Sequence, residues 1–109
     1  GQPAVQAMNG QPKFRWQATL SEATARSTAQ LIGAVLTMQV DPLESGEHTV
    51  VLSNRRERMA EGEPTLKVVL RWHRSQQRRC QVEVHSSAEG PFADPWSLQL
   101  AQRLKQILA

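Results

Sequence analysis

The strongest constraint on the fold lies between residues 65 and 87, where two runs of alternating apolar and polar side chains flank an arginine-rich bend. A period of two indicates strands with one buried face, because successive side chains of a strand point to opposite sides of a sheet. The stretch therefore predicts two neighbouring strands. The side chains predicted to face inward are Leu66, Val68, Leu70 and Trp72 in the first strand, and Cys80, Val82 and Val84 in the second.

A bend centred near Gln76 would pair these two strands as an antiparallel hairpin. One register then satisfies the whole apolar face, which is the usual way in which a register is specified. The predicted pairs are Trp72 with Cys80, Leu70 with Val82, and Val68 with Val84. The outward residues of the hairpin are Lys67, Val69, Arg71, His73, Arg79, Gln81, Glu83 and His85.

Two further strands are predicted before this hairpin. Residues 13–20 alternate well enough for a half-buried strand, and a short apolar run surrounds Val51. Between these two strands, Ser21 is placed as the N-cap of a helix that continues to about Met38. Residues 41–48 contain a proline and a glycine and are predicted to form a loop. The apolar stripe predicted for the helix comprises Ala25, Thr28, Leu31, Val35 and Met38, flanked by Ile32 and Leu36.

A second helix is predicted at the end of the chain. Asp94 would be its N-cap and Pro95 its first residue, and Lys105 lies near its C-terminal end, where the helix dipole favours a cation. Its apolar stripe comprises Trp96, Leu100, Leu104, Ile107 and Leu108.

The resulting order of elements, β-α-β-β-β-α, predicts an α+β fold. The simplest arrangement is a four-stranded antiparallel sheet with both helices packed on one face. The chain of 109 residues suits a single domain, which we place at 13–109. Residues 1–12 show no periodicity and are predicted to form a flexible leader.

Positive charge is concentrated in one part of the chain. The formal net charge is +3, and eight of the thirteen basic residues fall between positions 55 and 79. Such a local excess favours anionic partners, including phospholipid headgroups, nucleic acid and acidic proteins. The residues predicted to bind an anionic surface are Lys67, Arg71, Arg74, Arg78 and Arg79, with Lys13 and Arg15 on the same outer face.

The sequence contains no motif for catalysis or for a cofactor. Glycine-rich phosphate loops and a nucleophile elbow are absent, and no pair of histidine or cysteine residues has the spacing of metal ligands. In the predicted register, His73 and His85 are about 20 Å apart at ~3.3 Å per residue, and Cys80 points to the other face. We therefore expect no catalytic, cofactor-binding or metal-binding residues, although flanking arginines could lower the pKa of the Cys80 thiol.

The three tryptophans fall on apolar faces. Trp16 and Trp72 are predicted to be core residues, whereas Trp96 begins a helix and is a candidate for a protein interface. The outer face of the predicted sheet carries no phenylalanine, tyrosine or tryptophan, which disfavours the stacking of RNA bases on the sheet.

The chain resembles a known family in "KFRW", the following helix, the three-strand meander and the final "ADPWSLQLAQRLKQILA". These features are similar to the kinase-associated C-terminal domain of kinases related to the AMP-activated kinase, over residues 14–108. The resemblance implies binding of anionic phospholipids through scattered basic residues, and it makes Arg71, Arg74, Arg78 and Arg79 candidate headgroup contacts. The same order of elements also resembles the platform of adaptor appendages, which grip short peptides, and longin-type domains.

These observations predict a non-catalytic interaction module of a larger protein. We expect it to dock to a protein partner, to an anionic phospholipid surface, or to both, through the basic sheet face and the hairpin. A peptide-binding platform that uses Trp96 and the last helix is one alternative, and sequence-independent nucleic-acid binding is another. The single cysteine gives no indication of an oxidising compartment, so the expected location is cytoplasmic, with peripheral association to a membrane.

Overall fold

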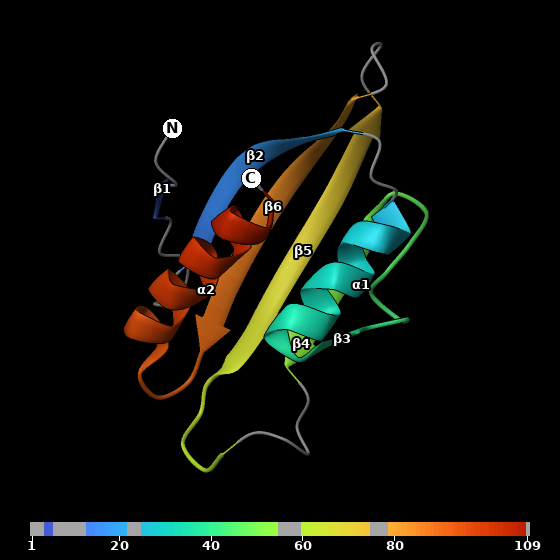
Figure 1. Cartoon of the computed structure of the whole chain (residues 1–109). Coiled ribbons are helices and arrows are strands. Elements are labelled where there is room, and N and C mark those ends of the chain that lie inside the picture. The colour runs from blue at the N-terminus through green and yellow to red at the C-terminus, as the bar shows by residue number, and fades with distance from the viewer. Residues whose placement is uncertain (1–3, 6–12, 22–24, 55–59, 75–78, 109) are drawn as a thin grey trace.

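A computed structural model describes residues 4–5, 13–21, 25–54, 60–74 and 79–108 (Figure 1). The backbone alone is described for Ala4, Val5, Leu20, Ser21, Ala25, Arg26, Arg74, Arg79 and Cys80. The described residues form six strands and two helices. In chain order they are β1 (Ala4–Val5), β2 (Lys13–Ser21), α1 (Ala25–Leu36), β3 (Met38–Val40), β4 (Thr49–Asn54), β5 (Thr65–Arg74), β6 (Arg79–Glu89) and α2 (Ala93–Ile107).

The sheet is antiparallel throughout, with the strand order β1-β2-β6-β5-β4-β3. The α+β class is confirmed, and the four expected strands form the centre of the sheet. The expected number of four is too low, because the two-residue β1 and the three-residue β3 extend its edges. β1 falls within the predicted flexible leader and pairs with β2, while the other leader residues lie outside the described part of the chain.

The predicted hairpin register is wrong by two residues. Trp72 lies opposite Val82, Leu70 opposite Val84, and Val68 opposite Ser86. Because side chains alternate with a period of two, this shift leaves every residue on its predicted face. The apolar pattern alone therefore could not distinguish the two registers, and β6 continues to Glu89 on the same alternation.

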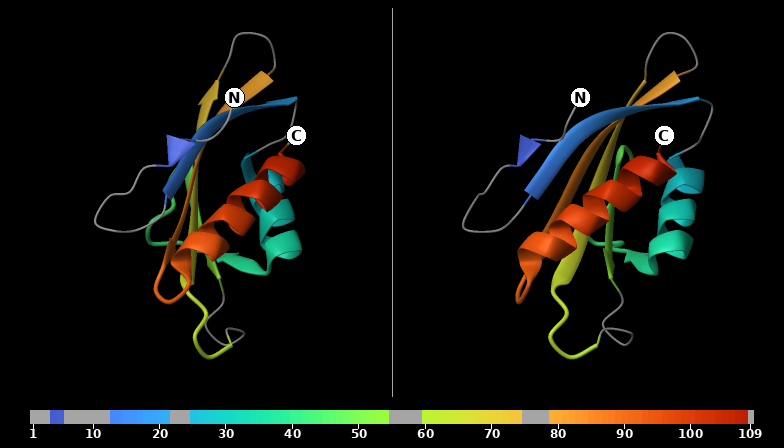
Figure 2. Two further views of the ribbon diagram at one scale, coloured as in Figure 1. Left: turned by 90° about the vertical axis from the view of Figure 1, so that its left-hand side faces the viewer. Right: turned by 60° about the vertical axis from the view of Figure 1, so that its left-hand side comes forward.

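Both helices lie on the same side of the sheet in the two views of Figure 2. α2 packs against β6 and β2, and α1 packs against β3 and β4. The inward side chains of the central strands and one stripe of each helix enclose a single core. Its buried members are Ile32, Met38, Leu52, Val68, Leu70, Trp72, Val82, Val84, Leu100, Leu104 and Leu108.

Helix α1 departs from prediction in its limits. The described helix begins at Ala25, and Ser21, the predicted N-cap, is instead the last residue of β2. The helix ends at Leu36, and Thr37 adopts a positive φ of 53°, which breaks the helical path. Met38 consequently belongs to β3 and is buried there, rather than in the last turn of a helix.

The buried face of α1 also differs from the predicted stripe. Leu31 and Val35 are 49% and 46% exposed, whereas Ala29 and Ile32 are buried together with Thr28. Apolar residues surround much of this helix, so the sequence offers two neighbouring stripes of similar hydrophobicity. The position of β3 beside the helix selects the stripe that contains Ile32.

Helix α2 begins earlier than predicted. Its N-cap is Phe92, which has a left-handed backbone and makes no side-chain cap, and Asp94 lies within the first turn. A carboxylate in the first turn still interacts favourably with the helix dipole. Lys105 occupies the last turn as predicted, and Leu100 and Leu104 are buried. Neither described helix combines the length and the apolar character that a membrane-crossing helix requires.

Candidate functional site

The candidate site lies on the outer face, which we define as the side of the sheet that points away from the two helices. Strand register places its side chains in rows across β2, β6 and β5. Ser87 lies opposite both Lys13 and Lys67, and we call these three residues the lysine row. The next row along the strands comprises Arg15, His85 and Val69, and the third comprises Gln17, Glu83 and Arg71.

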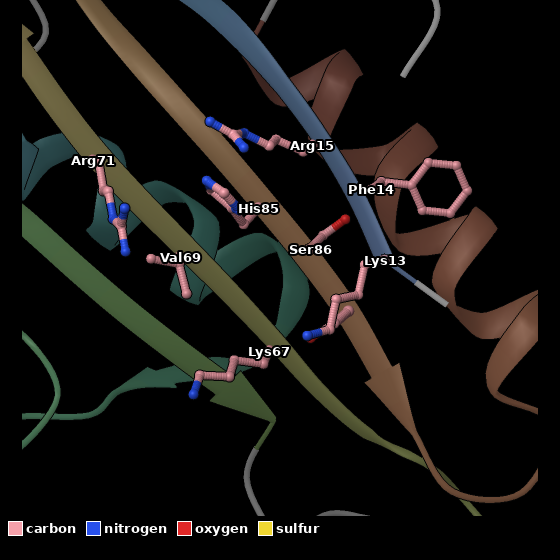
Figure 3. A pocket seen from close by; sticks show the side chains of 9 residues that line it. Lys13, Phe14, Arg15, Lys67, Val69, Arg71, His85 and Ser86 are labelled. Atoms are coloured by element: carbon pink, nitrogen blue, oxygen red, sulfur yellow. The ribbon is translucent and has the colours of Figure 1, made fainter. Parts of the chain in front are cut away.

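A hollow of about 210 Å³ opens on this face among the first two rows and Arg71 (Figure 3). Its floor is formed by short side chains, including Ser87 and Val69, while longer cationic side chains stand around it. Figure 3 shows Lys13 and Arg15 on β2, His85 on β6, and Lys67, Val69 and Arg71 on β5. Phe14 and Ser86 complete the lining, although the Phe14 ring points toward the helices and both residues are buried.

Glu83 lies beside the hollow and organises part of the outer face. Its side chain is 13% exposed, and its Oε1 is 2.8 Å from Arg15 Nη2 and 2.6 Å from His85 Nε2. An ionised carboxylate can only accept hydrogen bonds, so His85 Nε2–H is the donor. The other oxygen, Oε2, is 3.8 Å from His73 Nε2. Glu83, which lies in the same row as Arg71, therefore fixes the positions of Arg15 and His85 in the neighbouring row.

The pKa of the Glu83 carboxyl is lowered by these neighbours. The hydrogen bond from His85 is the largest cause, and the charges of Arg15 and Arg71 act in the same direction, while partial burial opposes them. Glu83 is therefore ionised at neutral pH and carries a permanent negative charge within a mostly basic face.

A second carboxylate reaches the outer face from the loop at 41–48. Glu44 Oε2 lies 2.9 Å from Lys67 Nζ, with 50% and 44% of the two side chains exposed. Val51 has an outward position opposite Val69 and yet is only 5% exposed. The same loop bonds to the Val51 backbone, through the Ser45 hydroxyl and the Asp41 amide, and this proximity accounts for the burial of Val51.

The structure brings together some of the predicted anion-binding residues. Lys67 and Arg71 line the hollow, and Lys13 and Arg15 join them from β2, as their outward positions predicted. Arg74 and Arg79 lie in β5 and β6, but their side chains are not described, and Arg78 lies outside the described residues. The predicted role of these three arginines therefore stays a prediction.

Two carboxylates of the face were missed as site residues. Glu83 was predicted to point outward, but the predicted register places it opposite Val69, whereas it actually lies opposite Arg71. The separation of about 20 Å expected between two histidines is also wrong, because His73 and His85 both approach the Glu83 carboxylate. Glu44 gave no sequence signal, since its contact with Lys67 depends on the path of a loop.

A smaller cleft of about 90 Å³ lies on the opposite side of the sheet, between the helices. Trp96 is half-buried there, at the N-terminal end of α2. The other lining residues are Leu36, Met38, Leu66, Gln99, Leu100 and Arg103. Arg103 Nη2 also donates to the Val35 carbonyl at 3.4 Å, which links the two helices.

Within the described residues, no three side chains of the metal-binding types are arranged to hold a metal ion. Comparison of the chain with protein-family models, with curated proteins and with solved structures gives no match. The resemblances to a kinase-associated domain, to adaptor platforms and to longin-type domains consequently remain predictions, and the outer face must be interpreted from its own chemistry.

Proposed function

We propose that this domain is a non-catalytic interaction module that docks an acidic segment of a partner protein onto the outer face. The observation that supports this proposal is the hollow itself. Among the described residues, its lining contains Lys13, Arg15, Lys67 and Arg71 but no carboxylate. Cations gathered around a recess attract and orient an anionic group more effectively than the same charges spread over a surface.

The balance of charge on this face favours an anionic partner. Arg15 is compensated by Glu83 and Lys67 by Glu44. Lys13 and Arg71 form no ion pair within 4.0 Å among the described residues, although Arg71 is close enough to influence the pKa of Glu83. Two positive charges therefore remain available to a partner.

The surroundings of the hollow favour a narrow protein segment over a flat bilayer. The loop at 41–48 borders the outer face and carries Asp41, Glu44 and Glu47, the last of which is 90% exposed in its side chain. A planar anionic membrane that approached this face would meet the Glu44 carboxylate, which reaches the face at Lys67, and like charges repel. An extended peptide can reach the hollow without passing over the loop.

The test is the binding of a fluorescein-labelled peptide of ten residues, mostly glutamate, measured by fluorescence anisotropy at 50 mM salt. We expect the double variant Lys13→Gln/Arg71→Gln to bind about tenfold more weakly, because each exposed cation contributes roughly 0.5–1 kcal/mol. Lys105→Gln is the control, since it removes one positive charge from α2, and should change the affinity less than twofold, whereas Lys13→Gln and Arg71→Gln alone should each weaken binding about threefold. Equal losses in the control and in these single variants would contradict a defined docking face.

Two further probes distinguish the macromolecular classes. Vesicles that contain phosphatidylserine test the phospholipid interpretation, and an RNA of mixed sequence tests the nucleic-acid one. We expect both to bind more weakly than the peptide at 150 mM salt, because the Glu44 carboxylate beside Lys67 repels a broad anionic surface more than a narrow segment. If the protein binds vesicles or RNA more tightly than the peptide, and if this binding is lost in Lys13→Gln/Arg71→Gln, then the partner is a membrane or a nucleic acid rather than a protein.

The cleft beside Trp96 supports a second candidate function, that of a peptide-binding platform. A half-buried tryptophan next to Leu66 and Arg103 offers both an apolar contact and a cation. Peptide binding at this cleft should tolerate high salt and should be lost in Trp96→Ala. The glutamate-rich peptide should bind Trp96→Ala and the unmodified protein equally well.

A further inference from the structure

We infer that the hollow is a subsite for one phosphate monoester, namely a phosphorylated serine or threonine within the docked acidic segment. This inference rests on the proposed function and specifies the group that the outer face recognises. Three properties of the hollow lead to it: its size, its uncompensated charge and the arrangement of its hydrogen-bond donors.

The size of the hollow suits a single side-chain group. At about 210 Å³ it falls below the ~300–1,000 Å³ of pockets that enclose whole small ligands. It also exceeds by several times the ~30 Å³ that one water molecule occupies in the liquid. A nucleotide or a complete lipid headgroup with its glycerol would extend well beyond the recess, whereas one phosphorylated side chain would not.

The uncompensated charge suits a dianion. Within the part of the chain that the structure describes, two of the four cations around the hollow are paired with carboxylates, which leaves the charges of Lys13 and Arg71. A phosphoserine carries about −1.5 to −2 at neutral pH, whereas an aspartate or glutamate side chain carries −1. One phosphate group therefore neutralises both of these positive charges, whereas one carboxylate would neutralise only one of them.

The donors of the hollow match the oxygens of a phosphate. In the lysine row, Lys13 and Lys67 flank Ser87 from the two neighbouring strands. The backbones of the two lysines are about 10 Å apart, at ~4.8 Å per strand. Long, flexible ammonium side chains can converge over the serine hydroxyl, which can itself donate. Arg71, on the same face of β5, can present two parallel N–H groups to a phosphate. The three terminal oxygens of a phosphate monoester thus find donors of three kinds.

Glu83 determines where in the hollow the phosphate lies. Its carboxylate occupies the row of Arg71 and repels an anion from that end, while it holds Arg15 and His85 against the neighbouring row. The phosphate is consequently placed over the lysine row. Figure 3 shows the Arg71 guanidinium turned along β5 towards Val69, so Arg71 can approach a phosphate there from the row of Glu83. Ser53, which lies opposite Lys67 in the same row but outside the lining, offers a matched control for Ser87.

The experiment compares three synthetic peptides of ten residues that differ only at the central position, where they carry phosphoserine, glutamate or serine between flanking glutamates. Isothermal titration calorimetry at pH 7.5 and 150 mM salt should give at least tenfold tighter binding for the phosphoserine peptide than for the glutamate peptide. ¹⁵N chemical-shift changes specific to phosphate should concentrate at the amides of Lys67 and Ser87.

Variants locate the effect. Ser87→Ala should reduce the preference for phosphoserine over glutamate by threefold or more, whereas Ser53→Ala should leave the preference unchanged. Lys13→Gln should reduce it further, because one of the two uncompensated charges is lost. Circular dichroism spectra and melting temperatures of the variants verify that the fold is intact.

The outcomes separate the two proposals. Equal binding of the phosphoserine and glutamate peptides would overturn the phosphate subsite and leave the proposed function standing. Failure of all three peptides to bind would overturn both. Inorganic phosphate and phosphatidic acid vesicles are then tested as competitors of the bound phosphoserine peptide. If either displaces half of the peptide at a concentration below the dissociation constant of the peptide, the phosphate comes from a source other than a protein, and the inference is overturned.

Discussion

The inner and outer faces of β5 and β6 are built from alternate residues of the same strands, and they differ in almost every physical property. On the inner face, Val68, Leu70, Val82 and Val84 are fully buried under the helices. On the outer face, cations stand around a hollow and carboxylates partly neutralise them. Stability therefore depends mainly on the inner face of the sheet and binding on the outer face. Substitutions on the inner face should lower the stability of the fold, and substitutions on the outer face should mainly change binding.

The largest expected effect is the truncation of an inner-face side chain. Leu70→Ala should lower the free energy of unfolding by about 2–5 kcal/mol, because it leaves a cavity in the core that both helices cover. Its neighbour Val69 points to the outer face, and Val69→Ala should lower the free energy by no more than about 1 kcal/mol. Urea denaturation followed by circular dichroism measures both, and similar losses would contradict the division between the faces.

Glu83→Gln should have a moderate effect, since the Glu83 carboxylate lies within 4.0 Å of Arg15, His73 and His85. The substitution weakens charge-assisted contacts with Arg15 and His85, and we expect a loss of about 1 kcal/mol at pH 7. Arg15→Gln removes only one partner of Glu83, at a more exposed position, and should lower stability less. A larger loss in Arg15→Gln would show that Glu83 is not the centre of this network.

The contribution of Glu83 should also depend on pH. The pKa of Glu83 is lower in the folded protein than in the unfolded chain, so the stabilisation is fully present above the ordinary glutamate pKa of about 4.3. It is lost as pH falls from there through the lowered pKa of the folded state. The difference in the free energy of unfolding between the unmodified protein and Glu83→Gln should therefore shrink progressively as the pH is lowered below about 4.3, and a difference that stays constant over that range would contradict this assignment.

Ser86 is an exception on the inner face, and its replacement should stabilise the protein. Its hydroxyl is buried and finds no hydrogen-bond partner among the described residues. Ser86→Ala removes this unsatisfied group at the cost of one small atom, and the free energy of unfolding should rise by about 1 kcal/mol. A decrease measured by thermal or urea unfolding would indicate that the hydroxyl is satisfied in solution.

The smallest expected change in stability concerns Glu44. Its ion pair with Lys67 is about half exposed, so Glu44→Gln should alter the free energy of unfolding by less than about 0.5 kcal/mol. The same substitution releases Lys67, and the glutamate-rich peptide should bind about two- to threefold tighter. Unchanged peptide binding would place the docked segment away from the lysine row and would thereby weaken the link between the hollow and function.

Several elements of the fold were predictable because local patterns specify them. The alternation in 65–74 and 79–89 assigned each side chain to its face, and the outward cations Lys67 and Arg71 followed directly. The last helix was predicted nearly in full, since Leu100 and Leu104 recur at helical spacing. In each case the signal lies within about ten residues of chain.

The errors share a different cause. The hairpin register, the buried stripe of α1 and the edge strands β1 and β3 all depend on which distant segment becomes a neighbour. Two registers bury the same apolar residues, and two stripes of α1 are similarly apolar, so local patterns leave these choices undecided. Glu83 escaped notice for the same reason, because its importance comes from partners on β2 and β5 rather than from its own surroundings in the chain.

The sequence by itself determined that this protein has an α+β fold, which residues of its central strands face the core, and that its outer face is basic. Only the tertiary structure decided that four cations surround one hollow, that Glu83 and Glu44 compensate two of them, and that Lys13 and Lys67 flank the same serine. The physical reason is that the direction of a side chain follows from the alternation of a single strand, whereas its neighbours follow from register and loop path, which long-range packing selects.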